Sequence, residues 1–531
     1  MSFKRPANTS LASARSASLA GFVGILCVIL GVLFLRSFAP AWVLFANDGP
    51  LGAIMSERSQ VPETFMGCWS DLNGYGSRDP GPSPNITFAL LWVLGPMGFA
   101  KFYAPITLLF LGMSAWFFIR QLGLGPVASL LGGLAAALMP DFFCDACWGT
   151  GSHLLCYGSN YLALGIVVSR QAIPPWLRYP LAGMAVGTGV MEGADIGALF
   201  SVFTALFVVF HALVTTERSA QGILYGGLRL LMIAAFAAFI AAASLSSLIE
   251  TQIKGVAGTQ QDKQTKEEQW DRATWGSFPK SDLPGLIVPG LFGYRMMGFD
   301  EGQPPEQAYW GRTGRDAAWD RYFASGKQGS PPQGPIRWGS GGGYVGAFVC
   351  ITACWALLQS FRKEKSVFSG VERKHIWFWA TTALVALLLS FGRYAPFYQL
   401  VYALPYASAV RIPSKFLHVF NWSLLVMFAH GLYGLGRRAE PSASTARDVF
   451  SQWQAWWSKA TAFDKRWVKS SWLVFATCGV GWIVYSGNRA WLVNYLQEVF
   501  FEASHANAIA RFSFSQAGIF LLFLAVALGL F

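Results

Sequence analysis

The chain has 531 residues, of which 53% are hydrophobic and only 13% are charged, and its mean hydropathy is +0.40. It is therefore too apolar for a soluble protein of ordinary composition. The net charge of +12 would suggest a nucleic-acid partner in a soluble protein, but here Lys and Arg gather in alternate loops, which is the positive-inside pattern. We expect an integral membrane protein with no nucleic-acid partner.

The first long apolar segment, residues 19–38, follows a polar and basic N-terminal stretch. No convincing Ala-x-Ala cleavage site accompanies it, so we interpret it as an uncleaved helix with its N-terminus in the cytoplasm. Residues 39–99 then form an external loop rich in Gly and Pro, with Asp48 at the point where the first helix leaves the membrane. Long irregular loops often carry function.

Further apolar segments alternate with polar stretches, and we interpret each of them as a membrane-spanning helix. They are residues 101–119, 127–139, 153–169, 180–191, 196–214, 229–249, 344–358, 376–390, 416–435, 474–485 and 515–531. The prediction is an all-α polytopic membrane protein with about 12 transmembrane helices and with both ends in the cytoplasm.

The domain organisation follows from the polar stretches. Residues 1–249 are predicted to form an N-terminal transmembrane core, and residues 343–531 the C-terminal transmembrane helices. Residues 250–342 have nearly balanced charge, which fits a large extracytoplasmic loop or cap because long loops escape the positive-inside rule. In the cytoplasmic stretch 437–470, tryptophans at helical spacing beside lysines indicate a helix on the surface of the membrane lipids.

This topology gathers charged side chains on the outer side of the membrane. Acids and a histidine at outer helix ends are Asp48, Asp141, Asp145, His153, Glu192 and Asp195, and basic residues bordering them are Arg393, Arg411 and Lys415. Each acid considered alone is more often a solvated loop residue. The simpler interpretation of the basic residues is that they anchor the chain at the membrane interface. His153 is more often a packing or capping residue than a ligand. Four other histidines, His211, His375, His418 and His430, are scattered and receive no role.

As a group, these residues suit one chemistry. A carboxylate can deprotonate an acceptor hydroxyl or hold a divalent cation such as Mg²⁺ or Mn²⁺, and basic residues near the headgroups can hold a lipid phosphate leaving group. These are the groups that glycosyl transfer from a polyprenyl-phosphate sugar donor requires. The sequence contains no phosphate-binding loop and no dinucleotide-binding glycine motif.

Several longer stretches carry a family resemblance. They are residues 102–140, GSHLLCYGSNYLALG at 151–165, residues 270–295, Tyr309-Trp310-Gly311, residues 343–346, and VRIPSKFLHVFNWSLLVMFAHGLYGL at 410–435. Together with an acid in the first external loop, they resemble the YfhO-like bacterial branch of the C-type membrane glycosyltransferases (GT-C). The RIPSKF-to-HGLYGL stretch is the most specific part.

The resemblance implies an extracytoplasmic active site in the bacterial inner membrane and an inverting transfer to an envelope glycan, lipid or protein acceptor. It also implies that Asp48 is the catalytic acid of the first loop, acting as base or metal ligand. Asp141, Asp145 and His153 match the region where such enzymes often carry a further acid or a metal contact. We accordingly predict Asp48, Asp141 and Asp145 as catalytic and assign the remaining six residues of the group to substrate binding.

Two other functions remain open. A transporter or lipid flippase would use the same apolar scaffold, although the predicted helix interiors are nearly free of charge and show no repeat symmetry. A non-catalytic scaffold of an envelope assembly would use residues 250–342 as a docking surface.

Overall fold

The structure is a computed structural model, and it describes the chain from residue 19 to residue 530 with internal gaps. The residues outside the description are 1–18, 63–64, 66–67, 71–76, 80–83, 170, 172, 217–218, 249–265, 296–304, 334–335, 338–342, 363–364, 405–410, 440–453, 455, 459 and 531. Part of the predicted cytoplasmic surface helix within 437–470 lies outside the described residues, and the end of this stretch forms the start of α19 (Ala462–Gly487). The described residues are mainly helical, with one short antiparallel sheet of β1 (Cys68–Ser70) and β2 (Ser77–Asp79).

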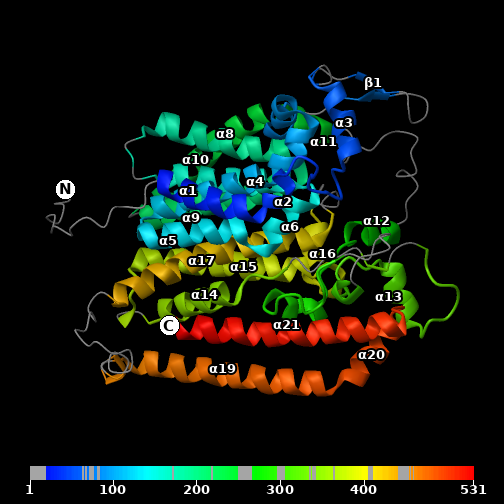
Figure 1. Cartoon of the computed structure of the whole chain (residues 1–531). Coiled ribbons are helices and arrows are strands. Elements are labelled where there is room, and N and C mark those ends of the chain that lie inside the picture. The colour runs from blue at the N-terminus through cyan, green and yellow to red at the C-terminus, as the bar shows by residue number, and fades with distance from the viewer. Residues whose placement is uncertain are drawn as a thin grey trace.

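The long helices run side by side in one bundle (Figure 1). They are α1 (Leu19–Leu33), α4 (Ile86–Leu122), α5 (Gly125–Leu138), α7 (Gly151–Val167), α8 (Pro175–Glu192), α9 (Ala194–Thr215), α10 (Ser219–Ile240), α14 (Ala347–Ser360), α15 (Gly370–Ser390), α17 (Phe416–Ala439), α19 (Ala462–Gly487) and α21 (Ala503–Gly529). Every apolar segment predicted from the sequence overlaps one of these helices.

Six of the described helices are long and apolar enough to cross a membrane, and a seventh span results if the bent pair α5 and α6 (Pro140–Trp148) is counted as one. The six are within α4, α9, α10, α17, α19 and α21. The chain is therefore a polytopic helical membrane protein. The number of about 12 spans stays a prediction.

Small residues let neighbouring helices approach closely. This is expected in a bilayer, where the hydrophobic effect does not drive helices together and close van der Waals packing has to do so. A Cβ atom added at Gly183 of α8 would lie 2.5 Å from the Ile233 carbonyl oxygen of α10, and one added at Gly187 would lie 2.7 Å from that of Ala237. Helices α8 and α10 therefore pack backbone against backbone.

Shorter elements gather at one end of the bundle (Figure 1). They include α3 (Leu51–Gln60), α12 (Lys266–Ala273), α13 (Ala317–Ala324) and α16 (Phe397–Tyr402), with the 3₁₀ helices η4 (Lys280–Leu286), η5 (Pro305–Gln307), η7 (Gly392–Tyr394) and η9 (Pro413–Lys415). The start of α1 and the end of α21 lie at the opposite end. Hereafter, the cap means the described residues 266–295, 305–333 and 336–337. Its position opposite both described chain ends agrees with the predicted topology.

One carboxylate attaches the cap to the bundle. Asp320 of α13 accepts hydrogen bonds from the Arg393 guanidinium at 2.7 and 3.1 Å and from the Tyr394 hydroxyl at 2.7 Å, and both donors lie in η7 directly after α15. Burial acts to raise the pKa of Asp320, but the hydrogen bonds from Tyr394 and Arg393 and the positive charge of Arg393 hold it below its usual range. Asp320 is therefore ionised at neutral pH.

The C-terminal helices cover the other side of the cap. Helix α20 (Arg489–Glu498) and the first turns of α21 share an apolar cluster with Ala308 and Trp310 of the cap. The cap is thus held by polar contacts from η7 and by apolar contacts from α20 and α21.

We expect the cap to face the outside of the cell and the loop after α14 to face the cytoplasm. In a Gln328→Cys variant, a membrane-impermeant maleimide should label the new thiol in intact cells, because Gln328 is exposed in the cap. In Lys365→Cys, the exposed thiol should react only after permeabilisation. Labelling of the unaltered chain provides the background from the native cysteines, and the reverse pattern would refute the topology.

Asp320→Asn should lower the free energy of unfolding by about 3 kcal/mol, because it leaves the largely buried Arg393 without its ionised partner. The pKa of Asp320 is lowered in the folded state. The stabilisation that ionised Asp320 contributes is therefore present above its unfolded-state pKa and is lost as the pH falls through its folded-state pKa. The difference between wild type and variant, measured by thermal unfolding, should therefore shrink below about pH 4. Asp316→Asn on the same helix should change little, since Asn caps a helix as well as Asp does.

Candidate active site

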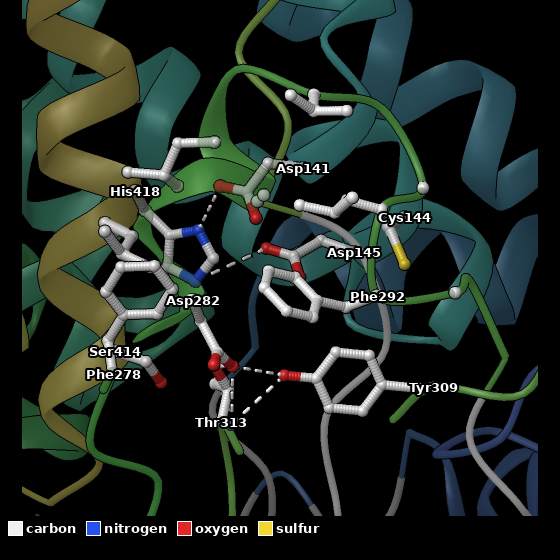
Figure 2. Close-up of a pocket in the computed structure, with 18 residues that line it drawn as sticks. Asp141, Cys144, Asp145, Phe278, Asp282, Phe292, Tyr309, Thr313, Ser414 and His418 are labelled. Atoms are coloured by element: carbon white, nitrogen blue, oxygen red, sulfur yellow. Dashed lines mark hydrogen bonds and ion pairs between the residues drawn. The ribbon is translucent and has the colours of Figure 1, made fainter. Parts of the chain in front are cut away.

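A cavity of about 170 Å³ lies between the bundle and the cap (Figure 2). Helix α6 contributes Asp141, Cys144 and Asp145 to its wall, and the start of α17 contributes Leu417 and His418. The cap side of the wall includes Phe278, Asp282, Leu286, Phe292, Tyr309 and Thr313. The cavity is therefore polar on the α6 and α17 side and partly apolar on the cap side.

The break between α5 and α6 directs two carboxylates toward this cavity. Met139 has non-helical backbone angles (φ −59°, ψ 126°) and Pro140 begins α6, and the two helices meet at a bend of 44°. Asp141 and Asp145 are four residues apart on α6, so they lie on the same helical face. The Tyr157 hydroxyl of α7 donates to Asp145 Oδ2 at 2.9 Å, which fixes that carboxylate.

Helix α17 brings an imidazole and an amide to the same carboxylates. His418 Nδ1 lies 2.9 Å from Asp141 Oδ2, and its Nε2 lies 3.9 Å from Asp145 Oδ2. The Asn421 amide also donates to Asp141 Oδ2, at 2.7 Å. An ionised Asp141 can only accept, so the hydrogen-bond network assigns the Nδ1 proton to the bond with Asp141 and directs Nε2 toward Asp145. Figure 2 shows the ring between the two carboxylates.

On the cap side of the cavity, Asp282 holds the loop that contains Tyr309 and Thr313. Asp282 is 3% exposed, and its Oδ2 accepts hydrogen bonds from the Tyr309 hydroxyl at 2.8 Å, the Arg312 amide at 2.8 Å, and the Thr313 amide and hydroxyl at 3.0 and 2.9 Å. These bonds hold Tyr309 and Thr313 against the cavity (Figure 2). Asp282 therefore positions the part of the cap that faces Asp141 and Asp145.

The structure brings five of the nine predicted site residues to this region. Asp141 and Asp145 line the cavity, and His153 Nδ1 lies 3.7 Å from Asp145 Oδ2. Lys415 forms an ion pair with Asp195 at the start of α9, and the preceding residue, Ser414, lines the cavity. Ser414 and Lys415 of the RIPSKF stretch therefore lie beside the predicted acids.

Asp48 lies next to this group but is not among the residues that line the cavity. Its side chain is exposed, and its amide donates to the Trp148 carbonyl at the C-terminal end of α6 at 2.9 Å. A Cβ atom at Gly149 would lie 2.8 Å from the Gly49 nitrogen, so only glycine permits this close approach. The first external loop is thus packed on the helix that carries Asp141 and Asp145.

Glu192, Arg393 and Arg411 lie elsewhere. Glu192 accepts hydrogen bonds from the Ile86 amide at 2.5 Å and the Thr87 hydroxyl at 2.6 Å, and so caps the N-terminus of α4. Arg393 holds Asp320, as described above. Arg411 borders a separate depression with Asp271 and Asp316. For these three residues, substrate binding stays a prediction.

The sequence pattern gives His418 no role, whereas the structure places its imidazole between Asp141 and Asp145. Asn421, Tyr157 and Asp282 were missed as well. For His418 and Asn421 a signal is present, because the two polar residues are three apart in an apolar helix and so share one face, directly after the RIPSKF stretch. Asp282 and Tyr157 reach the site through the tertiary fold, which no local pattern reveals.

The described residues include no group of three or more His, Cys, Asp or Glu side chains placed to hold a metal ion. The divalent cation, Mg²⁺ or Mn²⁺, stays a prediction.

Comparison with protein-family models, with curated proteins and with solved structures finds no match. Membership of the YfhO-like branch therefore stays a prediction.

Glu192→Ala should lower the free energy of unfolding by about 1–2 kcal/mol, because it removes the acceptor for the first amide of α4. Thermal unfolding in lipid measures the loss. Glu57→Ala on the exposed face of α3 is a matched control and should change stability little. Unchanged stability of Glu192→Ala would show that the capping contacts are unimportant.

Proposed function

We propose that the chain is an integral membrane glycosyltransferase that transfers a sugar from a polyprenyl-phosphate donor to an extracytoplasmic acceptor. The observation that carries this proposal is the arrangement of Asp141, Asp145 and His418 along one cavity at the capped end of the bundle. A proton acceptor at such an end can meet both a lipid-linked donor and a water-soluble acceptor.

In the proposed reaction, the acceptor hydroxyl loses its proton to the protein as its oxygen attacks the anomeric carbon of the sugar. The bond from that carbon to the phosphate oxygen breaks, and the lipid phosphate leaves with the electron pair. Attack from the face opposite the leaving group inverts the anomeric configuration. The protein has to position the hydroxyl, accept one proton and stabilise the phosphate.

Two groups are candidates for the proton acceptor. The first is the pair of Asp145 and His418, in which Asp141 orients the imidazole through Nδ1 and leaves Nε2 and Asp145 facing each other. A carboxylate that orients an imidazole in this way also stabilises the imidazolium that forms. The second is Asp48, which the resemblance implies and which is exposed beside α6.

Lys415 is the candidate for stabilising the leaving phosphate. Its ammonium group pairs with Asp195, and the preceding residue, Ser414, lines the cavity. An ammonium is a strongly hydrated point charge and suits a phosphate that must later leave.

All of the long helices from α1 to α21 would cross the bacterial inner membrane, giving about 12 spans with both chain ends in the cytoplasm. The acceptor would be an envelope glycan, lipid or protein, and the branch would be the YfhO-like GT-C enzymes.

Asp145→Asn and His418→Gln should each reduce the rate of sugar transfer by about 10²–10⁴-fold, because each removes a group that accepts or relays the proton. The assay follows a radiolabelled sugar from donor to acceptor in reconstituted lipid. Asp48→Asn in the same assay decides between the two candidate bases: a similar loss there, with activity retained in Asp145→Asn, would assign the base to Asp48. Asp316→Asn on the cap surface is the control. Full activity in all three site variants would contradict the proposed site.

A further inference from the structure

Three arginines lie close to the Asp320 carboxylate of the cap, and a fourth, Arg337, lies near them. Arg312, Arg315 and Arg393 lie within 4 Å of Asp320, and Arg337 is close enough to Arg315 for their charges to repel. In the described residues, Asp320 is the carboxylate that pairs with this group. The arginine cluster, defined as these four residues, therefore carries an excess of positive charge.

Two members of the arginine cluster are deeply buried and only partly paired. Arg315 is 4% exposed, and its Nε and Nη2 have no hydrogen-bond partner among the described residues. Arg337 is 8% exposed; its Nη2 donates to the Val499 carbonyl at 2.9 Å, while its Nε has no such partner. Burying a charge without hydrogen-bond partners is costly, so this arrangement is unfavourable by itself.

The surroundings hold both guanidinium planes in place. Arg315 stacks on the Phe323 ring at 4.7 Å, and Arg337 stacks on the Phe501 ring at 4.5 Å. Burial and the neighbouring charge of Arg315 lower the pKa of Arg337 to about 10, which still leaves it protonated at neutral pH. Two fixed, charged guanidinium groups with unused donors have the geometry that recognises carboxylate and phosphate groups.

The arginine cluster adjoins the candidate active site. Tyr309 lines the cavity, and it is also an electrostatic neighbour of Arg337. The cluster is on the cap side, where α13 meets the α20 and α21 end of the bundle (Figure 1).

We infer that Arg315 and Arg337, with Arg312 at their edge, form a binding site for an oxyanion, either a phosphate or a carboxylate. A bound oxyanion would accept from the unused Nε and Nη2 donors and compensate the excess charge. The existence of the site does not depend on the proposed transfer reaction. Its assignment to the water-exposed part of a saccharide or lipid substrate rests on the function proposed above.

The test measures anion binding directly and does not require transfer activity. Purified protein in lipid is titrated with inorganic phosphate and, separately, with glucuronate, at constant ionic strength maintained with chloride. Binding is followed by the thermal unfolding midpoint and by calorimetry. We expect a saturable rise in the midpoint with at least one of the two anions, and the anion that binds tighter distinguishes a phosphate substrate from an acidic sugar.

The variants locate the site. Arg315→Gln and Arg337→Gln should each weaken binding at least tenfold, and without anion they should unfold at the wild-type temperature or above, because each removes a buried and incompletely paired charge. Arg321→Gln is the matched control, since that arginine lies on α13 next to Asp320 but is 58% exposed and pairs with Asp271. It should bind like wild type.

Two outcomes would overturn the site. One is wild-type protein in which neither anion gives saturable binding, which needs no variant to interpret. The other is binding that persists unchanged in both buried-arginine variants. Since transfer is measured separately, loss of anion binding with transfer intact would reject the arginine cluster without rejecting the transferase, and the converse also holds.

Discussion

The imidazole of His418 lies between the carboxylates of Asp145 and of Asp141, which precedes it by 277 residues, and the site depends on these contacts. It requires the bend at Pro140, which turns α6 and its two acids toward α17. It also requires the Asn421 amide, which shares Asp141 with the imidazole and so keeps the ring in one orientation. Asp141 and Asp145 both have polar partners. Such partners are needed because burying an unpaired charge at the edge of a bilayer is costly.

Two further carboxylates, Asp320 and Asp282, lie in the cap and have different structural roles. Asp320 joins the cap to the bundle through Arg393 and Tyr394. Asp282 organises the loop that faces the cavity, through four hydrogen bonds on one oxygen. The Asp320 contacts therefore cross the boundary between cap and bundle, whereas the Asp282 contacts order the cap itself. These contacts do not neutralise the excess positive charge of the neighbouring arginine cluster.

Much of the fold is predictable from the chain because apolar segments of this length have few alternatives to helices in a bilayer. All of the predicted segments coincide with helices, and the polar region 250–342 supplies the cap. Six or seven helices meet the length and composition expected of a span. Several others, such as α14 and α7, are shorter, which is why the number of spans does not follow from the helices themselves.

The candidate site is less predictable, and its residues show why. Asp141 and Asp145 could be found because four-residue spacing places both on one helical face. His418 could not be paired with them, since the contact joins distant segments. Glu192 and Arg393 were assigned to substrate from their position along the chain, but the structure uses Glu192 to cap α4 and Arg393 to hold Asp320. Position in a topology thus identifies charged residues at one surface, and only the tertiary fold shows which of them already have partners.

The most direct test of the proposed transferase is incubation of the purified wild-type protein, in lipid, with a panel of polyprenyl-phosphate and polyprenyl-diphosphate sugars, with mass spectrometry of the lipid fraction. The proposal predicts that one donor is converted to its free lipid phosphate or diphosphate. If the folded protein leaves every donor intact, or moves a donor across sealed vesicles without breaking its glycosidic bond, the transferase assignment is contradicted and a transporter or scaffold takes its place.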